Sequence, residues 1–199
     1  MKYKEYINNN NKAMILLHEI YGINKHIEEV CQYYLNKGYD VYCPNLLSRD
    51  RPFDYSQSEE AYLNFKDTIG FDIFEQINIK AKQLRQSYKK VLLMGFSIGA
   101  TIAWRCTSSG FYDGMVGYYG SRIRDYISVM PKCPTLLIFA MEDSFDVDSV
   151  VEGLRHKEDI RTEVLTGKHG FLDTYSVNYH LNSSEKALML TAEFLISIG

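Results

Sequence analysis

The stretch that decides the fold runs from Val91 to Trp104 and reads VLLMGFSIGATIAW. Its first four residues are an apolar run typical of a buried strand, and its last five predict the start of an apolar helix. Between these two runs stands Gly95-Phe96-Ser97-Ile98-Gly99, a G-x-S-x-G sequence. A tight strand-to-helix turn leaves no room for side chains two residues before and after the serine, so glycine is needed at both positions. We therefore expect Ser97 to lie at a sharp, strained turn.

This context predicts that Ser97 is a catalytic nucleophile. A G-x-S-x-G between a strand and a helix is the nucleophile elbow of α/β-hydrolases, which presents the serine hydroxyl at the carboxyl end of the sheet. The first N–H groups of the following helix are free to bind an anion there. Because a serine hydroxyl is a poor nucleophile at neutral pH, a general base and an acid must lie elsewhere in the chain.

The composition limits the class of protein. The chain has 199 residues, of which 46% are hydrophobic and 24% charged, with a formal net charge of −3. This suits one domain with a substantial core and gives no basic surface for nucleic acid. The longest apolar run, Pro134–Met141, is too short to span a bilayer, and the N-terminus lacks the apolar region of a secretory signal. We expect a cytoplasmic monomer or homodimer with no nucleic-acid or membrane partner.

The cysteine pattern also indicates a cytoplasmic protein. They are widely spaced, without a CxxC pair or a metal-type cluster, and three of them fall in or beside predicted core elements. Free, buried thiols in a reducing cytosol are therefore expected at all four positions, Cys31, Cys43, Cys106 and Cys133.

Strands and helices are expected to alternate along the chain, which predicts an α/β fold with a mainly parallel central sheet and helices on both faces. Strands are expected at 3–7 (an edge strand), 13–17, 39–43, 90–94, 114–119, 135–140 and 161–165. Helices are expected at 24–37, 71–88, from the elbow to about 108, near 147–154, and from Asn182, which stands three residues before Glu185 as in a capping box, to 195. We therefore expect residues 1–199 to form a single α/β-hydrolase domain, in which about 50–75 could fold as a small cap or lip segment.

The general base is expected late in the chain, because this fold places the triad in the order serine, acid, histidine. Three of the five histidines follow Ser97. His169 comes just after the predicted strand 161–165, where a loop at the carboxyl end of the sheet would carry a base. His156 lies in a charged stretch and His180 near a helix cap, so His169 is the predicted base.

The acid is expected after the strand at 135–140. Four carboxylates crowd that loop: Glu142, Asp143, Asp146 and Asp148. A carboxylate there would fix the histidine tautomer and stabilise the imidazolium, and Asp143 is the first choice. The alternative is that these carboxylates cap the helix near 147–154.

Two backbone N–H groups are expected to form the oxyanion hole. One belongs to Ile98, the residue after the nucleophile. The other is expected from Ile20, in the loop at residues 18–22 that follows the first buried strand. Because these donors are backbone groups, conservative changes of either side chain would matter little.

Four further motifs occur in order: LHEIYGIN at 17–24, GYDVYCPNL at 38–46, VGYYG at 116–120 and HGF at 169–171. Together they resemble the dienelactone hydrolase family of α/β-hydrolases, whose patterns are H-E-[IW]-[FW]-G-[LI]-N, G-Y-x-V-x-x-P-D-L, V-x-[YF]-Y-G and H-[GS]-F. The resemblance runs through most of the chain. It implies the α/β-hydrolase fold and aligns the family's acid with Asp143 rather than Asp146.

One departure from the family pattern concerns the nucleophile. The founding members carry cysteine at the elbow, with the glutamate of H-E-I as the partner of the thiol, whereas this chain has Ser97, as esterase members do. Glu19 keeps the place of that glutamate. We expect it either to orient the oxyanion loop or bind substrate, or to have a purely structural role.

A second departure concerns the substrate. The family holds a substrate carboxylate with two arginines and a tyrosine. Tyr62 matches the tyrosine and is expected to bind substrate or support the site, but the arginine positions hold Ser58 and Asp173. A carboxylate would lose its bidentate partners and be repelled by Asp173, so dienelactone itself is not the expected substrate.

Aromatic residues are dense between Pro52 and Phe74. They would either line an apolar acyl or aryl pocket or pack this segment onto the core. Tyr118 and Tyr119 fall in a predicted strand, so we expect them on opposite faces, with no catalytic role.

The sequence therefore predicts a serine hydrolase that cleaves a small-molecule ester, as a carboxylesterase does, through an acyl-enzyme on Ser97. No metal or organic cofactor is expected. The alternatives are a thioester, lipid-ester or peptide hydrolase or an acyl transferase with the same triad, or a non-catalytic binding protein of this fold. A doubly wound nucleotide-binding protein is disfavoured, because no G-x-G-x-x-G turn follows the first strand.

Overall fold

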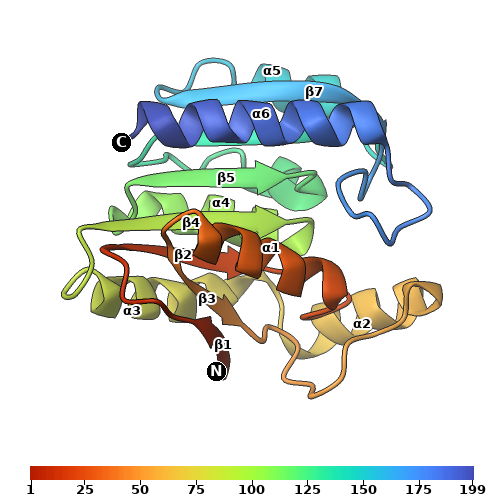
Figure 1. The fold of residues 1–199 in the computed structure, drawn as a ribbon. Helices are drawn as coiled ribbons and strands as arrows, with labels where there is room; N and C mark the ends of the chain where they lie inside the picture. Colours follow the sequence, from red (N-terminus) through yellow and green to blue (C-terminus); the bar gives the residue numbers. More distant parts are fainter.

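The centre of the molecule is a seven-stranded sheet in the order β1-β3-β2-β4-β5-β6-β7 (Figure 1). The computed structural model describes residues 1–199. The strands are β1 (Tyr3–Tyr6), β2 (Lys12–Leu17), β3 (Asp40–Pro44), β4 (Lys90–Phe96), β5 (Gly114–Tyr118), β6 (Thr135–Glu142) and β7 (Ile160–Lys168). Every neighbouring pair is parallel except β1 with β3, so β1 is the antiparallel edge strand. This is the mainly parallel arrangement predicted from the sequence.

Helices cover both faces of the sheet. They are α1 (Lys25–Asn36), α2 (Ser58–Thr68), α3 (Phe74–Leu84), α4 (Ile98–Cys106), α5 (Val147–Leu154) and α6 (Leu181–Ser197), with the 3₁₀ turns η1 (Tyr55–Gln57), η2 (Phe71–Ile73), η3 (Thr107–Ser109) and η4 (Ser121–Tyr126). The helices α1 and α6 pack on one face, and α3, α4 and α5 pack on the other. None of the helices is both long enough and apolar enough to cross a membrane.

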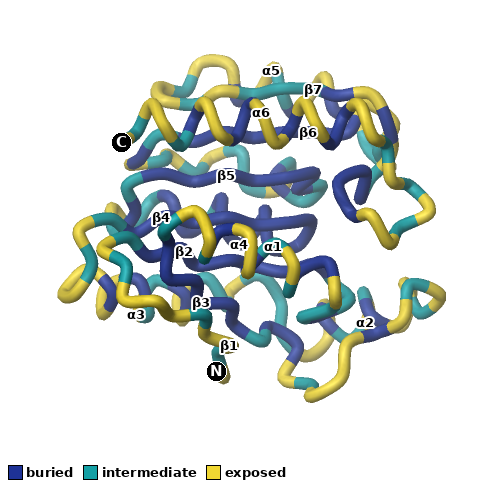
Figure 2. The backbone as a smooth tube through the Cα atoms, viewed as in Figure 1, coloured by how far each residue is buried: buried dark blue, intermediate teal, exposed yellow.

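Side-chain alternation along the strands divides the core into two layers. In β2, Ala13, Ile15 and Leu17 face the layer that contains α3 and α4, whereas Met14 and Leu16 face the layer under α1 and α6. Figure 2 shows the strands buried and the outer sides of the helices exposed. All four cysteines are buried and free.

Two local expectations are wrong. The helix α6 is capped by His180, whose side chain accepts a hydrogen bond from the Ser183 N–H, rather than by Asn182. Tyr118 and Tyr119 belong to the same core layer instead of opposite faces. The physical reason is that β5 ends at Tyr118 and Tyr119 has a φ of +41°, which interrupts the alternation of the strand.

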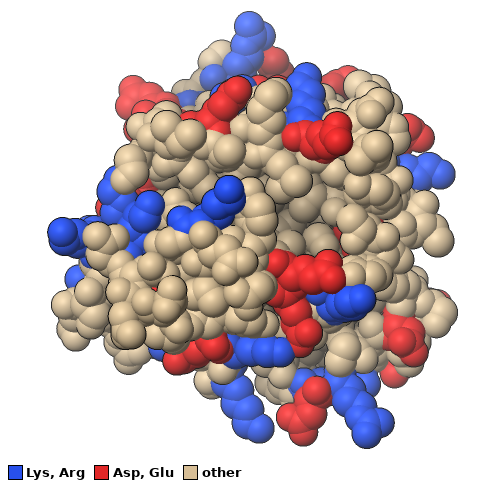
Figure 3. Space-filling view, in the orientation of Figure 1, with Lys and Arg blue, Asp and Glu red and all other residues tan.

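The two helices on the α1 side leave a hollow between them. Tyr34, Tyr118 and Leu188 are among the side chains that line this groove of about 260 Å³. Figure 3 shows the hollow in the middle of this face, with positive and negative side chains interspersed around it. The strands β4, β5, β6 and β7 are parallel, so their carboxyl ends lie at the same end of the sheet, and the loops predicted to carry the catalytic residues follow there.

Candidate active site

Ser97 lies at the turn between β4 and α4. Its φ is +53°, in the left-handed region that favours glycine, and its N–H donates to the Tyr118 carbonyl oxygen at 3.0 Å. This hydrogen bond ties the turn to the end of the neighbouring strand. A non-glycine residue held in this conformation is strained, as expected for an elbow.

Close backbone approaches explain the two glycines of the elbow. A Cβ atom on Gly95 would lie 2.3 Å from the Gly99 carbonyl oxygen, and a Cβ atom on Gly99 would lie 2.3 Å from the Leu17 carbonyl oxygen. Gly99 therefore allows the first turn of α4 to sit directly against the end of β2. This contact places Ser97 beside the loop that follows β2.

His169 bridges Ser97 and Asp143. Its Nε2 atom lies 2.8 Å from Ser97 Oγ, and its Nδ1 atom lies 2.8 Å from Asp143 Oδ2. When Nδ1–H is donated to the carboxylate, Nε2 is free to accept the serine proton. The three residues predicted as base, acid and nucleophile are thus brought together, with His169 directly after β7 and Asp143 directly after β6.

The other three carboxylates of this loop do not contact His169. Asp146 is the N-cap of α5 and accepts hydrogen bonds from Ser149 N at 3.1 Å and Ser149 Oγ at 2.6 Å. These bonds lower the pKa of Asp146. Glu142 and Asp148 are exposed. The helix-capping alternative therefore holds for Asp146, while Asp143, with a side chain only 1% exposed, contacts the histidine.

Opposing effects act on the pKa of His169. Burial lowers it, but the hydrogen bond and the negative charge of Asp143, together with the charge of Glu19, outweigh burial and raise the pKa above its ordinary value. The imidazolium that forms during proton transfer is therefore stabilised.

His18 holds the loop that follows β2. Its Nδ1–H donates to the Glu19 carbonyl oxygen at 2.6 Å, and its Nε2 accepts from the Leu46 N–H at 3.0 Å. Burial lowers the pKa of His18 to about 4, so the ring is neutral at neutral pH and can make both bonds. This loop brings Ile20 to the cleft that also contains Ser97 and Ile98. Ile20 and Ile98 are the two residues predicted to supply the oxyanion hole. Because Ile98 is the first residue of α4, its N–H has no acceptor within the helix.

Glu19 and Tyr119 form a buried pair beside the catalytic histidine. Glu19 is 5% exposed and accepts a hydrogen bond from Tyr119 Oη at 3.0 Å. Burial raises the pKa of Glu19, and the charges of His26 and His169 partly offset this effect. The Tyr119 ring packs against His169 with 5.0 Å between the ring centroids. No catalytic role was expected for Tyr119, and the one signal for its place at the site is its position just before Gly120 in the VGYYG motif.

The catalytic residues open into a cleft of about 500 Å³. Only three lining residues are hydrophobic, and one of them is Tyr62 on α2. The phenylalanines between Pro52 and Phe74 do not line the cleft. Phe53 and Phe65 are buried in the core, and Phe74 packs against the core. The aromatic segment therefore follows the core-packing alternative, and the cleft is mainly polar.

The two positions at which the family carries arginine do not face the cleft. Ser58 begins α2 and is exposed. Asp173 is 1% exposed and accepts hydrogen bonds from the Tyr55 hydroxyl and, at 2.8 Å, from the Tyr175 N–H. The expected direct repulsion of a substrate by Asp173 is therefore not supported. The structure has no group of three or more His, Cys, Asp or Glu side chains arranged to hold a metal ion.

Comparisons with known proteins agree with this architecture. A sequence model of the dienelactone hydrolase family matches residues 4–198. The chain is 39% identical over 170 residues to the uncharacterized protein YczH of Bacillus subtilis, covering 84% of each chain. It is 29% identical over 144 residues to the carboxymethylenebutenolidase of Pseudomonas putida, covering 67% of this chain and 61% of that enzyme.

Among solved structures, the dienelactone hydrolase of Anabaena variabilis superposes with a TM-score of 0.69 at 18% identity, over 99% of this chain and 92% of the other. At that identity the likeness concerns the fold alone. The family resemblance and the α/β-hydrolase fold predicted from the sequence are confirmed.

The elbow geometry generates a prediction about stability. Gly99→Ala would place a methyl group against the Leu17 carbonyl, and we expect at least about 3 kcal/mol of destabilisation or failure to fold. Gly153→Ala in α5 is the matched control, because its nearest contact would be an ordinary 3.4 Å to Ile127. There the helix preference of alanine should give a gain of up to about 1 kcal/mol. Chemical denaturation of both variants tests this, and equal stabilities would contradict it.

The buried His18 predicts a pH dependence of stability. Because its pKa falls from 6.5 to about 4 on folding, protonation favours the unfolded chain, and the stabilisation present above pH 6.5 is lost as the pH falls toward 4. This loss should amount to about 3 kcal/mol in the free energy of unfolding. His18→Gln should remove that part of the pH dependence, whereas the exposed His156→Gln should retain it. Urea unfolding at several pH values measures the difference, and parallel curves for His18→Gln and the parent chain would contradict the assignment.

Proposed function

This chain belongs to the dienelactone hydrolase family, and we propose that it is a serine hydrolase that cleaves a small ester through an acyl-enzyme on Ser97. The observation that carries the proposal is the continuous hydrogen-bonded line from Ser97 Oγ through His169 to Asp143, with 2.8 Å at each step. A serine held in this way has a base within reach of its proton, which is the requirement for nucleophilic attack.

In the acylation half of the reaction, Ser97 Oγ attacks the ester carbonyl carbon while His169 Nε2 takes the hydroxyl proton. Asp143 keeps the imidazole in the required tautomer and stabilises the imidazolium. The negative charge on the carbonyl oxygen is held by the N–H groups of Ile98 and Ile20. When the tetrahedral intermediate collapses, the bond to the alkoxy oxygen breaks, and His169 returns the proton to the departing alcohol.

Deacylation repeats the same steps with water as the nucleophile. His169 accepts a proton from water, the resulting hydroxide adds to the acyl carbon, and the bond to Ser97 Oγ breaks as the serine regains its proton from His169. The products are a carboxylic acid and an alcohol. All steps use groups of this chain, and Tyr62 on the cleft wall is proposed to contact the bound substrate.

An ester is the favoured substrate among the carbonyl compounds that such a triad could cleave. Relatives named carboxymethylenebutenolidase support this choice, because a butenolide is a lactone and therefore an internal ester. Thioesters, lipid esters and peptides remain alternative substrates of the same three residues. The intact hydrogen-bonded triad argues against a protein that only binds ligands.

The first test is covalent labelling of the nucleophile. A fluorophosphonate probe should form one adduct on Ser97, because phosphorus is attacked by an activated serine in the same way as an ester carbon. Peptide mapping by mass spectrometry locates the adduct, and Ser97→Ala should abolish it. An absent adduct on the folded parent chain, or one that survives in Ser97→Ala, would sink the assignment of the nucleophile.

The second test separates the acid from its neighbour. Asp143→Asn should lower kcat/KM for an activated ester by at least about a thousandfold, whereas Asp146→Asn, which only loses charge at a helix cap, should keep most activity. Because Asp143 helps to raise the pKa of His169, the acidic limb of the residual activity should move to lower pH in Asp143→Asn. A larger loss in Asp146→Asn would make our assignment of the acid wrong.

A further inference from the structure

A groove runs along the face of the molecule that α1 and α6 cover. Its first lobe is the hollow of about 260 Å³ between these helices. A second lobe, of about 460 Å³, adjoins the first at Tyr33, Tyr34 and Leu188, which line both. The two lobes together are called the α1–α6 groove below. This groove shares no lining residue with the catalytic cleft, so it is separate from the triad.

The walls of the groove are apolar and stay partly open to solvent. In the second lobe every lining residue except Lys12, Lys37 and Gly199 is hydrophobic. Tyr33 on α1 is 45% exposed and Ile196 on α6 is 79% exposed. Contiguous apolar surface of this kind, rimmed by polar residues, marks a site for a ligand or a partner. The occupant of this groove therefore has an apolar body.

Two lysines of the second lobe, Lys12 and Lys37, have no acidic partner; they are called the groove lysines below. Neither makes an ion pair or a side-chain hydrogen bond. Their ammonium groups lie over aromatic rings, at 4.6 Å from the centre of the Tyr39 ring for Lys12 and 5.3 Å from that of the Tyr33 ring for Lys37. No aspartate or glutamate side chain lines this lobe. The lobe thus offers two oriented cations to an anion.

The end of α6 does not neutralise the groove lysines. Gly199 also lines the second lobe. The Lys90 ammonium group lies beside Gly199 and donates a hydrogen bond to the Ile198 carbonyl oxygen. A carboxylate group at Gly199 therefore meets a cation of its own.

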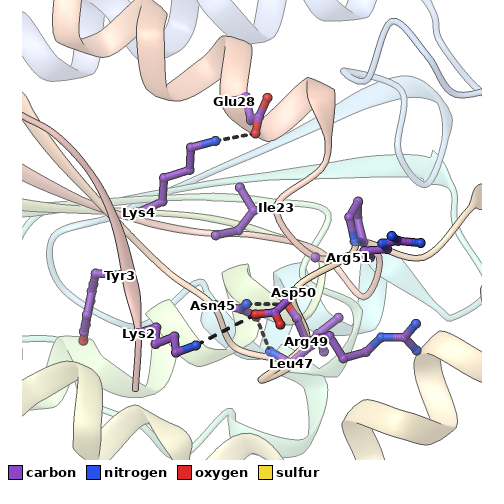
Figure 4. A pocket seen from close by; sticks show the side chains of 12 residues that line it. Lys2, Tyr3, Lys4, Ile23, Glu28, Asn45, Leu47, Arg49, Asp50 and Arg51 are labelled. Atoms are coloured by element: carbon purple, nitrogen blue, oxygen red, sulfur yellow. Dashed lines mark hydrogen bonds and ion pairs between the residues drawn. The ribbon is translucent and has the colours of Figure 1, made fainter.

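A polar cavity elsewhere in the molecule shows the contrasting arrangement. It measures about 240 Å³ and lies between the N-terminal strand and the loop after β3. Figure 4 shows its lysines directed at carboxylates: Lys4 pairs with Glu28, and Lys2 lies 3.9 Å from Asp50. These lysines are neutralised within the chain, whereas the groove lysines leave their charge to be neutralised by a ligand.

Charge and length together define the shape of the occupant. The groove follows α6 from Ser184 in the first lobe to Ile196 in the second. At the rise of an α-helix this stretch spans about 18 Å. Both cations lie in the second lobe, whereas the first lobe is lined by no lysine or arginine and includes Glu29. A cationic end followed by a long apolar trough matches an amphiphile with one anionic head and one extended chain.

We propose that the α1–α6 groove binds a free long-chain fatty carboxylate, with its head at Lys12 and Lys37 and its chain along the groove toward Tyr118 and Leu172. Burial of the chain against the apolar walls drives binding, and charge-assisted hydrogen bonds from the two ammonium groups fix the head. A groove between two helices suits one chain better than the two chains of a phospholipid. A second copy of this chain, packed on the second lobe by twofold symmetry, would add two more lysines and no carboxylate side chain from that lobe.

The experiment titrates the folded chain with laurate, below the concentration at which laurate aggregates, in a calorimeter. One saturable site is expected. Decanoate, with two fewer CH₂ groups, should bind about fifteenfold more weakly. Dodecanol, which keeps the chain and lacks the charge, should bind at least about tenfold more weakly, as measured by its displacement of laurate. Dodecanedioate should also bind more weakly than laurate, because its second carboxylate would lie in the lobe that contains Glu29.

Single variants then assign laurate binding to the groove. Lys12→Gln and Lys37→Gln should each weaken it by about tenfold and leave dodecanol binding unchanged. Ala192→Trp, at an exposed position that lines the second lobe, should fill the lobe and abolish binding. The matched controls are Lys82→Gln on the exposed side of α3 and Met189→Trp on α6 outside both lobes, and both should bind laurate as the parent chain does. Circular dichroism verifies that each variant is folded.

Each rival occupant has its own result. Laurate binding that is blocked by a fluorophosphonate on Ser97 and survives Ala192→Trp would place laurate in the catalytic cleft and overturn the proposal. So would binding only to vesicles of anionic phospholipid, or the absence of laurate binding together with a dimer that Ala192→Trp dissociates. Laurate binding that is unaffected by the label on Ser97 and lost in Ala192→Trp supports the groove. Because labelling of Ser97 is read separately, this inference and the proposed esterase function can fail independently.

Discussion

The close contact between the first turn of α4 and the carboxyl end of β2 is the constraint on which the rest of the site depends. At Gly99 the two backbones approach so closely that a Cβ atom would lie 2.3 Å from the Leu17 carbonyl oxygen. This contact sets the direction in which α4 leaves the sheet and places Ser97 at φ +53°. It also brings the N–H end of α4 next to the loop fixed by His18. One backbone approach therefore determines the position of the nucleophile and of both proposed oxyanion donors.

The elements that sequence analysis could predict are those governed by local patterns. The elbow, the alternating strands and helices, and the position of His169 after β7 all follow from residue spacing and from the chain order of the fold. The assignment of Asp143 as the acid was harder to predict, because four carboxylates share one loop. Local sequence does not say which of them turns toward the histidine. The structure separates them by packing: Asp146 is used at the helix cap, whereas Asp143 is enclosed beside His169.

Features that depend on contacts between distant segments could not be predicted from the sequence. Tyr119 was treated as a strand residue, but its positive φ turns its ring against His169 and its hydroxyl toward Glu19, a residue 100 positions away in the chain. The aromatic residues between Pro52 and Phe74 could have served a pocket or the core, because hydrophobicity alone does not distinguish the two. Phe53 and Phe65 are buried in the core and Phe71 and Phe74 pack against it, whereas Tyr62 lines the cleft.

The placement of charge around the cleft explains how the same fold can retain a polar site without the arginines of its family pattern. Asp173, at one of those positions, is buried, bonded to Tyr55 and directed away from the cleft, so that it links the segment before α2 to the loop that carries the histidine. Two cations on the cleft wall, Arg124 in η4 and Lys168 at the end of β7, come from other elements than these two positions. A buried charge without a partner costs much desolvation free energy, whereas a cation at the wall of an open cleft stays in contact with solvent and needs no ion pair. The cleft around Ser97 is therefore lined mainly by polar and charged side chains, because most of the aromatic residues that could have lined it pack into the core instead.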